Sequence, residues 1–266
     1  MIANVRRSHG MGMGEAMRAG VFAVLVLSCL FAGTGLVKAQ EREGTAGQPA
    51  PADKVDQEEM RHLIREGLQL LKSGQPRQAI DNDFDKIIAA YEAAYKHGKV
   101  QVYSIANPAE ALAYMAMAAK DGKHAVALDD TWAYALYFKG YALVEVGDLA
   151  GGEAVLQQAQ AMAPFNPQIM MERANIHKLR KEWPQAMELY QEAAGFASGF
   201  ARPGLEADME AKANHGIAYI DSETGKLDEA EAIYKKCLEK NPQDGYAKNE
   251  LQYIAEQRAK QARPGR

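Results

Sequence analysis

The fold is decided by a 34-residue stretch in the middle of the chain, AYALYFKGYALVEVGDLAGGEAVLQQAQAMAPFN, residues 133–166. Apolar residues recur at helical spacing in both halves, and Gly147-Asp148 separates the halves. The pattern predicts two antiparallel helices, A and B, in which small residues at positions 8 and 20 allow a close crossing. The positions that carry the pattern are Leu136, Gly140, Leu143, Gly147, Leu156, Ala159 and Pro164.

Residues 167–200 repeat this pattern in phase and without a gap. The repeated positions are Met170, Ala174, Ala186, Tyr190 and Ala193. A third unit follows, marked by Gly225, Ala230, Tyr234, Cys237 and Pro242. Ala230 lies 44 residues after Ala186, which predicts an insertion of about ten residues at 201–210. The distance from Gly216 to Gly225 suggests that the first helix of the third unit is two residues longer than usual.

The region before residue 129 is divergent. Residues 60–79 keep the repeat positions of a first helix, but the pattern breaks after Ala79, where one helix is predicted to run on to His97. Asn107-Pro108 predicts the start of a further helix that reaches Leu128 with a bend at Gly122. Residues 98–107 have no assignment.

The 34-residue spacing and the in-phase pair resemble the tetratricopeptide-repeat (TPR) family, and the chain is also similar to exported bacterial TPR proteins. The resemblance covers residues 130–245 well and 60–80 in part. It implies an all-α solenoid of helix-turn-helix units, with divergent N-terminal helices and a C-terminal capping helix. The expected organisation is a signal peptide at 1–39, a flexible linker at 40–57, a divergent helical region with one partial repeat at 58–128, two in-phase units at 129–200, the insertion at 201–210, a third unit plus cap at 211–260, and a tail at 261–266.

The resemblance also implies a peptide-binding groove. In the family, helix-A positions 2, 5, 6, 9, 12 and 13 line the concave face. The groove residues expected on this basis are Tyr134, Tyr137, Phe138, Tyr141, Glu145, Met171, Glu172, Asn175 and Lys178. We expect part of this aromatic stripe to be exposed, although a core role is an open alternative for each residue. Some family members hold a C-terminal carboxylate, and the two glutamates speak against that specificity here.

No stretch of the sequence predicts catalysis, a cofactor or a metal site. The six histidines are scattered, and no phosphate-binding loop or nucleophile motif is present. Asp81, Asp83 and Asp85 have a spacing similar to that of a calcium loop, but Lys86 stands where that loop needs glycine. Cys237 falls at a small-residue position and is expected to be buried. The formal net charge of −4 and the lack of a basic stripe argue against nucleic acid as a partner.

The first 40 residues predict export. Arg6, Arg7 and Arg18 precede an apolar run from Val21 to Phe31, and cleavage is expected after Ala39. Lipidation of Cys29, twin-arginine export and an uncleaved anchor are the alternatives, and only the first and last would attach the protein to a membrane. All of them make the protein periplasmic or secreted.

The sequence therefore predicts a non-catalytic adaptor of the cell envelope that binds an unidentified protein or peptide through its concave face. The alternative is a structural scaffold that self-associates or sits at the membrane. The sequence does not predict the oligomeric state.

Overall fold

The computed structural model describes residues 55–95 and 100–262. The predicted signal peptide and nearly all of the linker lie outside these residues. Within the described part of the chain, no helix combines the length and the apolarity needed to cross a membrane.

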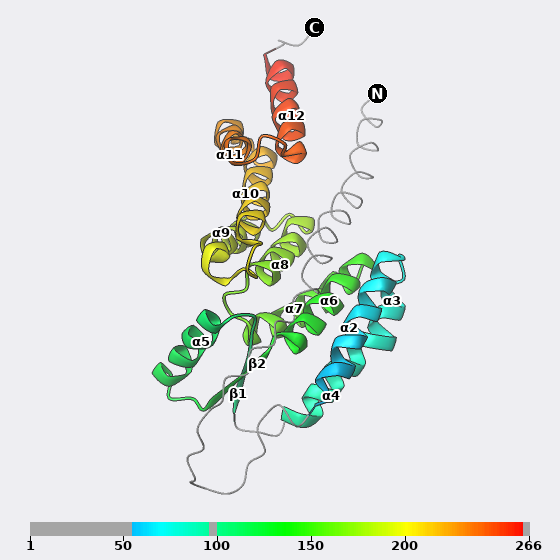
Figure 1. Ribbon diagram of the computed structural model, residues 1–266. Coiled ribbons are helices and arrows are strands. Elements are labelled where there is room, and N and C mark those ends of the chain that lie inside the picture. Colours follow the sequence, from blue (N-terminus) through cyan, green and yellow to red (C-terminus); the bar gives the residue numbers. More distant parts are fainter. Residues whose placement is uncertain (1–54, 96–99, 263–266) are drawn as a thin grey trace, which may run out of the picture. The chain divides into compact units, whose positions relative to one another are not determined.

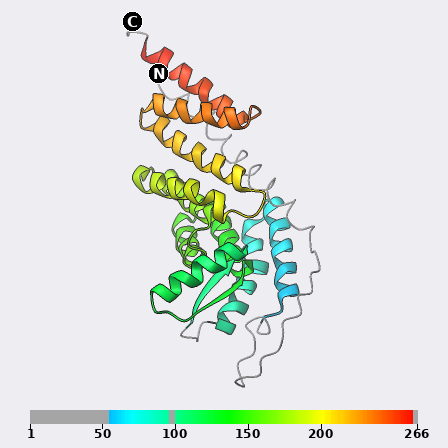
Figure 2. The same cartoon turned by 60° about the vertical axis from the view of Figure 1, so that its left-hand side comes forward.

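The helices from residue 131 onward form consecutive antiparallel pairs, as the repeat predicts. Their bounds are α6 Thr131–Glu145, α7 Leu149–Met162, α8 Pro167–Leu179, α9 Trp183–Phe200, α10 Glu206–Glu223, α11 Leu227–Lys240 and α12 Gly245–Gln261. Each helix packs on the next, and α6, α8, α10 and α12 also contact one another in order. These four helices are called the A row below, and α7, α9 and α11 the B helices. Figures 1 and 2 both show α8 to α12 stacked in sequence order.

The close crossing of α6 and α7 has the cause that the sequence predicts. A Cβ atom added at Gly140 would lie 2.5 Å from Cγ of the fully buried Leu156. On the facing helix, a Cβ added at Gly152 would lie 3.1 Å from the carbonyl oxygen of Gly140. The two glycines therefore allow the backbones to approach to a distance that larger residues would prevent.

The first helix of the third unit is longer than its counterparts, as predicted, with 18 residues in α10 against 15 in α6 and 13 in α8. The assignment of Gly216 to position 8 is wrong, because the extra length precedes that position and the spacing after it is regular. Ala218 is fully buried with Ala230, Tyr234 and Cys237, so Ala218 occupies position 8 of a unit that starts at residue 211. Gly216 instead faces the preceding helix, where an added Cβ would lie 2.4 Å from the Tyr190 ring. Gly216 and Ala218 are both small enough for position 8, and only their packing in the structure shows which of them occupies it.

The ten inserted residues do not form a separate loop. Helices α9 and α10 have 18 residues each, whereas α7 has 14 and α8 has 13. Residues 206–210, predicted as insertion, belong to α10, and only Ala201–Leu205 connects the two helices. The insertion therefore mainly lengthens one helix pair.

The break after Ala79 is a π-helical turn. Helix α2 spans Gln57–Lys72, and the facing helix consists of α3 Pro76–Ala79, the π segment η2 Ile80–Phe84 and α4 Asp85–Tyr95. A π turn adds one residue to the helix. In an uninterrupted repeat, the large residue that packs against Gly67 would be residue 83. Because of the extra residue it is Phe84, and a Cβ added at Gly67 would lie 2.5 Å from the Phe84 ring.

The stretch from 101 to 129 corrects the prediction of one long helix. It forms strand β1 Gln101–Ile105, helix α5 Pro108–Lys120 and strand β2 Ala125–Asp129, with the strands parallel and Gln101 opposite Ala125. Helix α5 ends because Gly122 adopts a positive φ of 67° and the Lys123 N–H donates to the Ala118 carbonyl, which is a Schellman ending. The fold remains all-α, with this small two-stranded sheet inside the region predicted as helical.

The β1-α5-β2 segment is attached to the repeats through aromatic side chains. Tyr114 of α5 is fully buried between Tyr103 of β1, at 5.3 Å between ring centroids, and Phe165 in the α7–α8 turn, at 5.4 Å. The Phe165 N–H donates to the Tyr114 hydroxyl oxygen at 3.3 Å. Phe200, in the last turn of α9, stacks on the same ring. The sheet is thereby fastened to the first two regular units.

Candidate functional site

The four aromatic residues expected in the groove are buried. Tyr134, Tyr137, Phe138 and Tyr141 have at most 5% of their surface exposed. The expectation that part of this stripe is exposed is therefore wrong. The structure does bring the four residues together on α6, since the Tyr134, Tyr137 and Phe138 rings contact one another.

Three neighbours cover the stripe, and two of them, Phe84 and Arg202, could not be identified from repeat spacing. Phe84 of η2 stacks on Phe138 with 5.9 Å between ring centroids. The Arg202 guanidinium lies over the Tyr134 ring at 4.0 Å from its centroid. Gln168 of α8 accepts a hydrogen bond from the Tyr134 hydroxyl at 3.1 Å and donates one to the Tyr137 hydroxyl at 3.2 Å.

The remaining expected groove residues lie farther along the A row. Met171 and Glu172 are buried, whereas Glu145, Asn175 and Lys178 are half-buried. The same face continues onto α10 and α12, where Lys178 Nζ lies 5.2 Å from the Tyr219 ring centroid. We call this surface the acidic-aromatic face, and its members are Glu145, Glu172, Asn175, Lys178, Tyr219, Glu223, Tyr246, Glu250 and Tyr253.

The α10 and α12 part of the face was not predicted, because groove positions were assigned only in the first two units and Gly216 was taken as position 8 of the third. With the unit starting at residue 211, Tyr219 and Glu223 fall at positions 9 and 13. A further unit starting at residue 245 places Tyr246, Glu250 and Tyr253 at positions 2, 6 and 9. These are the positions that line the groove in the family, so the correct register would have found them.

Glu172 is the buried centre of this face, and its two carboxylate oxygens differ. Only 4% of the residue is exposed. Oε2 accepts a hydrogen bond from Asn175 Nδ2 at 3.4 Å, and Asn175 in turn accepts one from the Tyr190 hydroxyl. Oε1 is buried without a hydrogen-bond partner. A buried acceptor left unpaired costs free energy, which marks this position as one that a donor could stabilise.

Burial shifts the pKa of both charged groups at the centre. The pKa of Glu172 is raised to about 7, mainly by burial and less by the Glu145 charge, and the Asn175 hydrogen bond and the Lys178 charge oppose the shift. Burial lowers the pKa of Lys178 to about 8, while the charges of Glu172 and Glu250 oppose this change. Both groups therefore titrate close to neutral pH, so the charge of the face depends on pH in that range.

Glu172→Gln is expected to remove a pH dependence of stability. A carboxyl whose folded pKa is raised contributes stability that is present at low pH and is lost as the pH rises from about 4.5 to about 7. For a buried group this loss is up to about 3 kcal/mol. Urea unfolding at a series of pH values should show the loss in the unchanged protein and not in the variant. Glu188→Gln on the exposed side of α9 is the control, and parallel pH profiles for all three proteins would contradict the assignment.

The groups on this face are suited to binding. Its acidic residues outnumber its single lysine, and its tyrosine rings lie beside them. Carboxylates with aromatic rings suit a cationic side chain, which gains from both charge and cation–π contact. The face therefore combines negative charge with aromatic rings.

Comparison with known proteins shows similarity in fold. No family model matches the sequence, and no curated protein matches it. The TPR-like repeats of a putative kinesin light chain from Podosopora anserina are 12% identical over 80% of this chain and 90% of that chain, with a TM-score of 0.52. MamA from Desulfovibrio magneticus RS-1 is 12% identical over 76% of this chain and 86% of that one, with a TM-score of 0.48.

The helix pairs, the 34-residue spacing and the likeness to the kinesin light chain repeats agree with one another. The short sheet between α4 and α6 is an addition to this architecture and does not interrupt the A row. The chain is a protein of the tetratricopeptide-repeat fold.

Proposed function

We propose that the protein is a non-catalytic binding module that holds a basic segment of a partner protein along the acidic-aromatic face. The observation that carries the proposal is Glu172, a buried carboxylate with one unpaired oxygen at the centre of the A row. The neighbouring Glu145, Glu223 and Glu250 extend the same charge along three helices. A partner lysine or arginine on this face would neutralise part of this charge.

The structure also changes which variants can test binding. Replacing Tyr137 and Tyr141 by alanine would remove two buried rings and destabilise the repeat by several kcal/mol, at about 3 to 5 kcal/mol for each large aromatic residue. Loss of binding in such a variant would not be informative. Charge reversal at the surface avoids this problem because it leaves the core unchanged.

The full-length chain should prefer basic peptides over neutral and acidic ones. The test uses three peptides of equal length that carry lysine, glutamine or glutamate at the same positions, with affinity measured by fluorescence anisotropy at two salt concentrations. We expect the lysine peptide to bind tightest and to weaken as salt increases, because screening reduces attraction between exposed charges. Equal affinity for the three peptides would contradict the proposal.

Two double variants locate the binding face. Glu223→Lys with Glu250→Lys reverses charge on the A row and is expected to weaken the lysine peptide at least about tenfold, which corresponds to about 1.4 kcal/mol. Glu229→Lys with Glu239→Lys makes the same change in net charge on exposed positions of the B helix α11 and is expected to have little effect. An equal loss in both variants would assign the effect to net charge and remove the A row from the proposal.

The place of action is the cell envelope in this proposal, on the basis of the export signal that the sequence predicts in residues 1–39. Fractionation of cells that express the full chain, with detection of the mature N-terminus, tests cleavage after Ala39. A self-associating scaffold is the alternative, and light scattering over a range of concentrations distinguishes it from a monomeric adaptor.

A further inference from the structure

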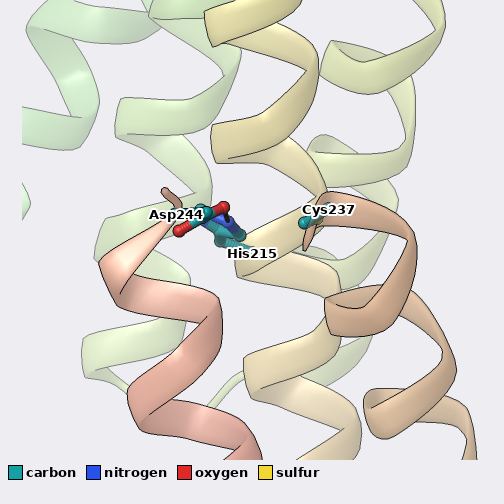
Figure 3. A group of neighbouring side chains, drawn as sticks. All are labelled: His215, Cys237 and Asp244. Carbon is teal, nitrogen blue, oxygen red and sulfur yellow. Dashed lines mark hydrogen bonds and ion pairs between the residues drawn. The ribbon is translucent and has the colours of Figure 1, made fainter. Parts of the chain in front are cut away.

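Three side chains that can ligate a metal meet at the C-terminal end of the repeats. They are His215 of α10, Cys237 in the last turn of α11 and Asp244, which precedes α12. One ligand atom from each lies within 4.8 Å of the other two. His215 Nε2 and Asp244 Oδ2 are 2.7 Å apart. Figure 3 shows the three side chains gathered between the helices that carry them.

Neighbouring contacts hold two of these side chains in place. Asp244 is the N-cap of α12, and its Oδ1 accepts a hydrogen bond from the Ala247 N–H at 3.0 Å, which leaves Oδ2 directed at His215. The His215 ring stacks on Tyr246 with 4.7 Å between ring centroids. Ligand side chains that are oriented before the ion arrives lose less entropy on binding it.

The third group is a thiol that the fold leaves without a covalent partner. Cys237 is 5% exposed and is a free cysteine. The backbone turn beyond it is ordered, since the Asn241 N–H donates to the Cys237 carbonyl at 2.8 Å and the Asp244 N–H donates to the Asn241 carbonyl at 3.0 Å. Figure 3 shows the His215 side chain between Asp244 and Cys237.

The donor set favours zinc over the hard cations. Thiolate sulfur and imidazole nitrogen are soft or intermediate donors, whereas calcium and magnesium require several oxygen ligands and find one carboxylate here. Zinc bonds of about 2.0 to 2.3 Å in a tetrahedral arrangement place ligand atoms roughly 3.3 to 3.7 Å apart. The histidine–aspartate pair would open slightly and the sulfur would move inward, which side-chain rotations can provide.

We propose that His215, Cys237 and Asp244 bind one zinc ion, with water as the fourth ligand, and that the ion fastens α12 to the third repeat. The ligands come from α10, α11 and the turn before α12, so one ion links all three elements. The three residues are 22 and 7 residues apart and form no known motif, so the sequence alone does not indicate this site. The proposal is independent of the peptide partner.

The test uses the full-length chain with Cys29→Ser as background, so that Cys237 is its only thiol. Zinc is titrated in competition with a chromophoric chelator, and cobalt is used as a spectroscopic substitute. We expect one zinc per chain, a thiolate-to-cobalt charge-transfer band in the near ultraviolet, and a higher melting temperature with zinc than with a chelator. Absence of the band would overturn the proposal, because it would show that Cys237 does not bind the ion.

Two variants and one control distinguish zinc binding by these side chains from a purely structural role. Cys237→Ala should abolish the cobalt band and the zinc-dependent rise in melting temperature. Asp244→Asn keeps an N-cap residue of equal quality and should lower zinc affinity at least about tenfold through loss of the charged ligand. Asp148→Asn changes the N-cap of α7 in the same way, away from the three ligands, and should leave zinc affinity unchanged. If Cys237→Ala fails to fold, Asp244→Asn decides, and unchanged affinity in that variant overturns the proposal.

Discussion

Gly140→Ala is expected to lower the free energy of unfolding by about 2 kcal/mol, which is the opposite of what alanine usually does in a helix. Alanine is favoured over glycine in helices by about 1 kcal/mol. Here the new Cβ would lie 2.5 Å from Leu156 Cγ, and Leu156 is fully buried. Overpacking of a closed core costs about 1 to 3 kcal/mol, so the steric term outweighs the propensity gain.

Gly195→Ala is the matched control for this prediction. Gly195 lies inside α9, is exposed, and an added Cβ would meet nothing within 4 Å. This variant should be more stable than the unchanged protein by up to about 1 kcal/mol. Urea unfolding measures both changes, and a stabilising Gly140→Ala would show that the α6–α7 crossing is looser than the structure has it.

The pair Gly140→Ala and Leu156→Ala tests the same contact from both sides. Leu156→Ala alone removes a buried side chain and should cost about 2 to 5 kcal/mol. Because the new methyl group at residue 140 occupies part of the vacated space, the double variant should be more stable than the sum of the single effects predicts, by about 1 kcal/mol or more. Strict additivity would contradict direct contact between the two positions.

Arg202→Met is expected to cost about 2 to 4 kcal/mol at pH 8, because it leaves the half-buried Asp130 carboxylate and the buried Glu110 carboxylate without a neighbouring cation. Arg202 forms an ion pair with Asp130 and lies over the Tyr134 ring. Its charge also opposes the rise in the pKa of Glu110 that burial causes. One guanidinium therefore offsets two carboxylates and covers one aromatic ring.

The pH dependence of the stability of Arg202→Met distinguishes the loss of the positive charge from the loss of packing. Burial raises the pKa of Asp130, and Arg202 holds it down. Without Arg202 the folded-state pKa rises further, and a raised carboxyl loses stability as the pH increases. The difference from the unchanged protein should thus be larger at pH 8 than at pH 4. Arg180→Met, on an exposed arginine at the end of α8, should change stability by no more than about 0.5 kcal/mol.

A pH-independent loss in Arg202→Met would assign the effect to its packing over Tyr134 alone. Amide hydrogen exchange tests the role of the ion pair independently. Asp130 directly follows β2, so loss of its partner should affect the strands first. If the ion pair holds the β1-α5-β2 segment on the repeats, the amides of Gln101–Ile105 and Ala125–Asp129 should exchange faster in the variant than those of α11.

The repeat could be predicted wherever its spacing is unbroken. The sizes of the residues at positions 8, 20 and 24 decide whether two helices can cross closely. Gly140 and Leu156 occupy two of these positions, so the crossing can be predicted from the residue types alone. The pattern was lost after Ala79 because the π turn Ile80–Phe84 shifts every later position by one. The register of the third unit was misread because Gly216 and Ala218 are both small, and only packing shows that Ala218 lies against its own unit and Gly216 against Tyr190.

The strands and the functional face depended on contacts that are distant in sequence. A strand of five residues gains its hydrogen bonds only from a partner, so Gln101–Ile105 could not be assigned without Ala125–Asp129. Whether an aromatic stripe is core or surface depends on what packs over it. Phe84 and Arg202, 54 residues before and 64 residues after Phe138, close the stripe at Tyr134–Tyr141.

By itself, the sequence determined that the chain is a series of paired helices with an A row, because helical periodicity and small crossing residues are local properties. The tertiary structure alone decided which part of that row is accessible: the tyrosines of α6 and Glu172 of α8 are buried, whereas glutamates and tyrosines of α10 and α12 are partly or fully exposed. It also decided that His215, Cys237 and Asp244 meet. The burial of a side chain and the meeting of residues distant in sequence depend on the path of the whole chain, so a short sequence pattern does not predict them.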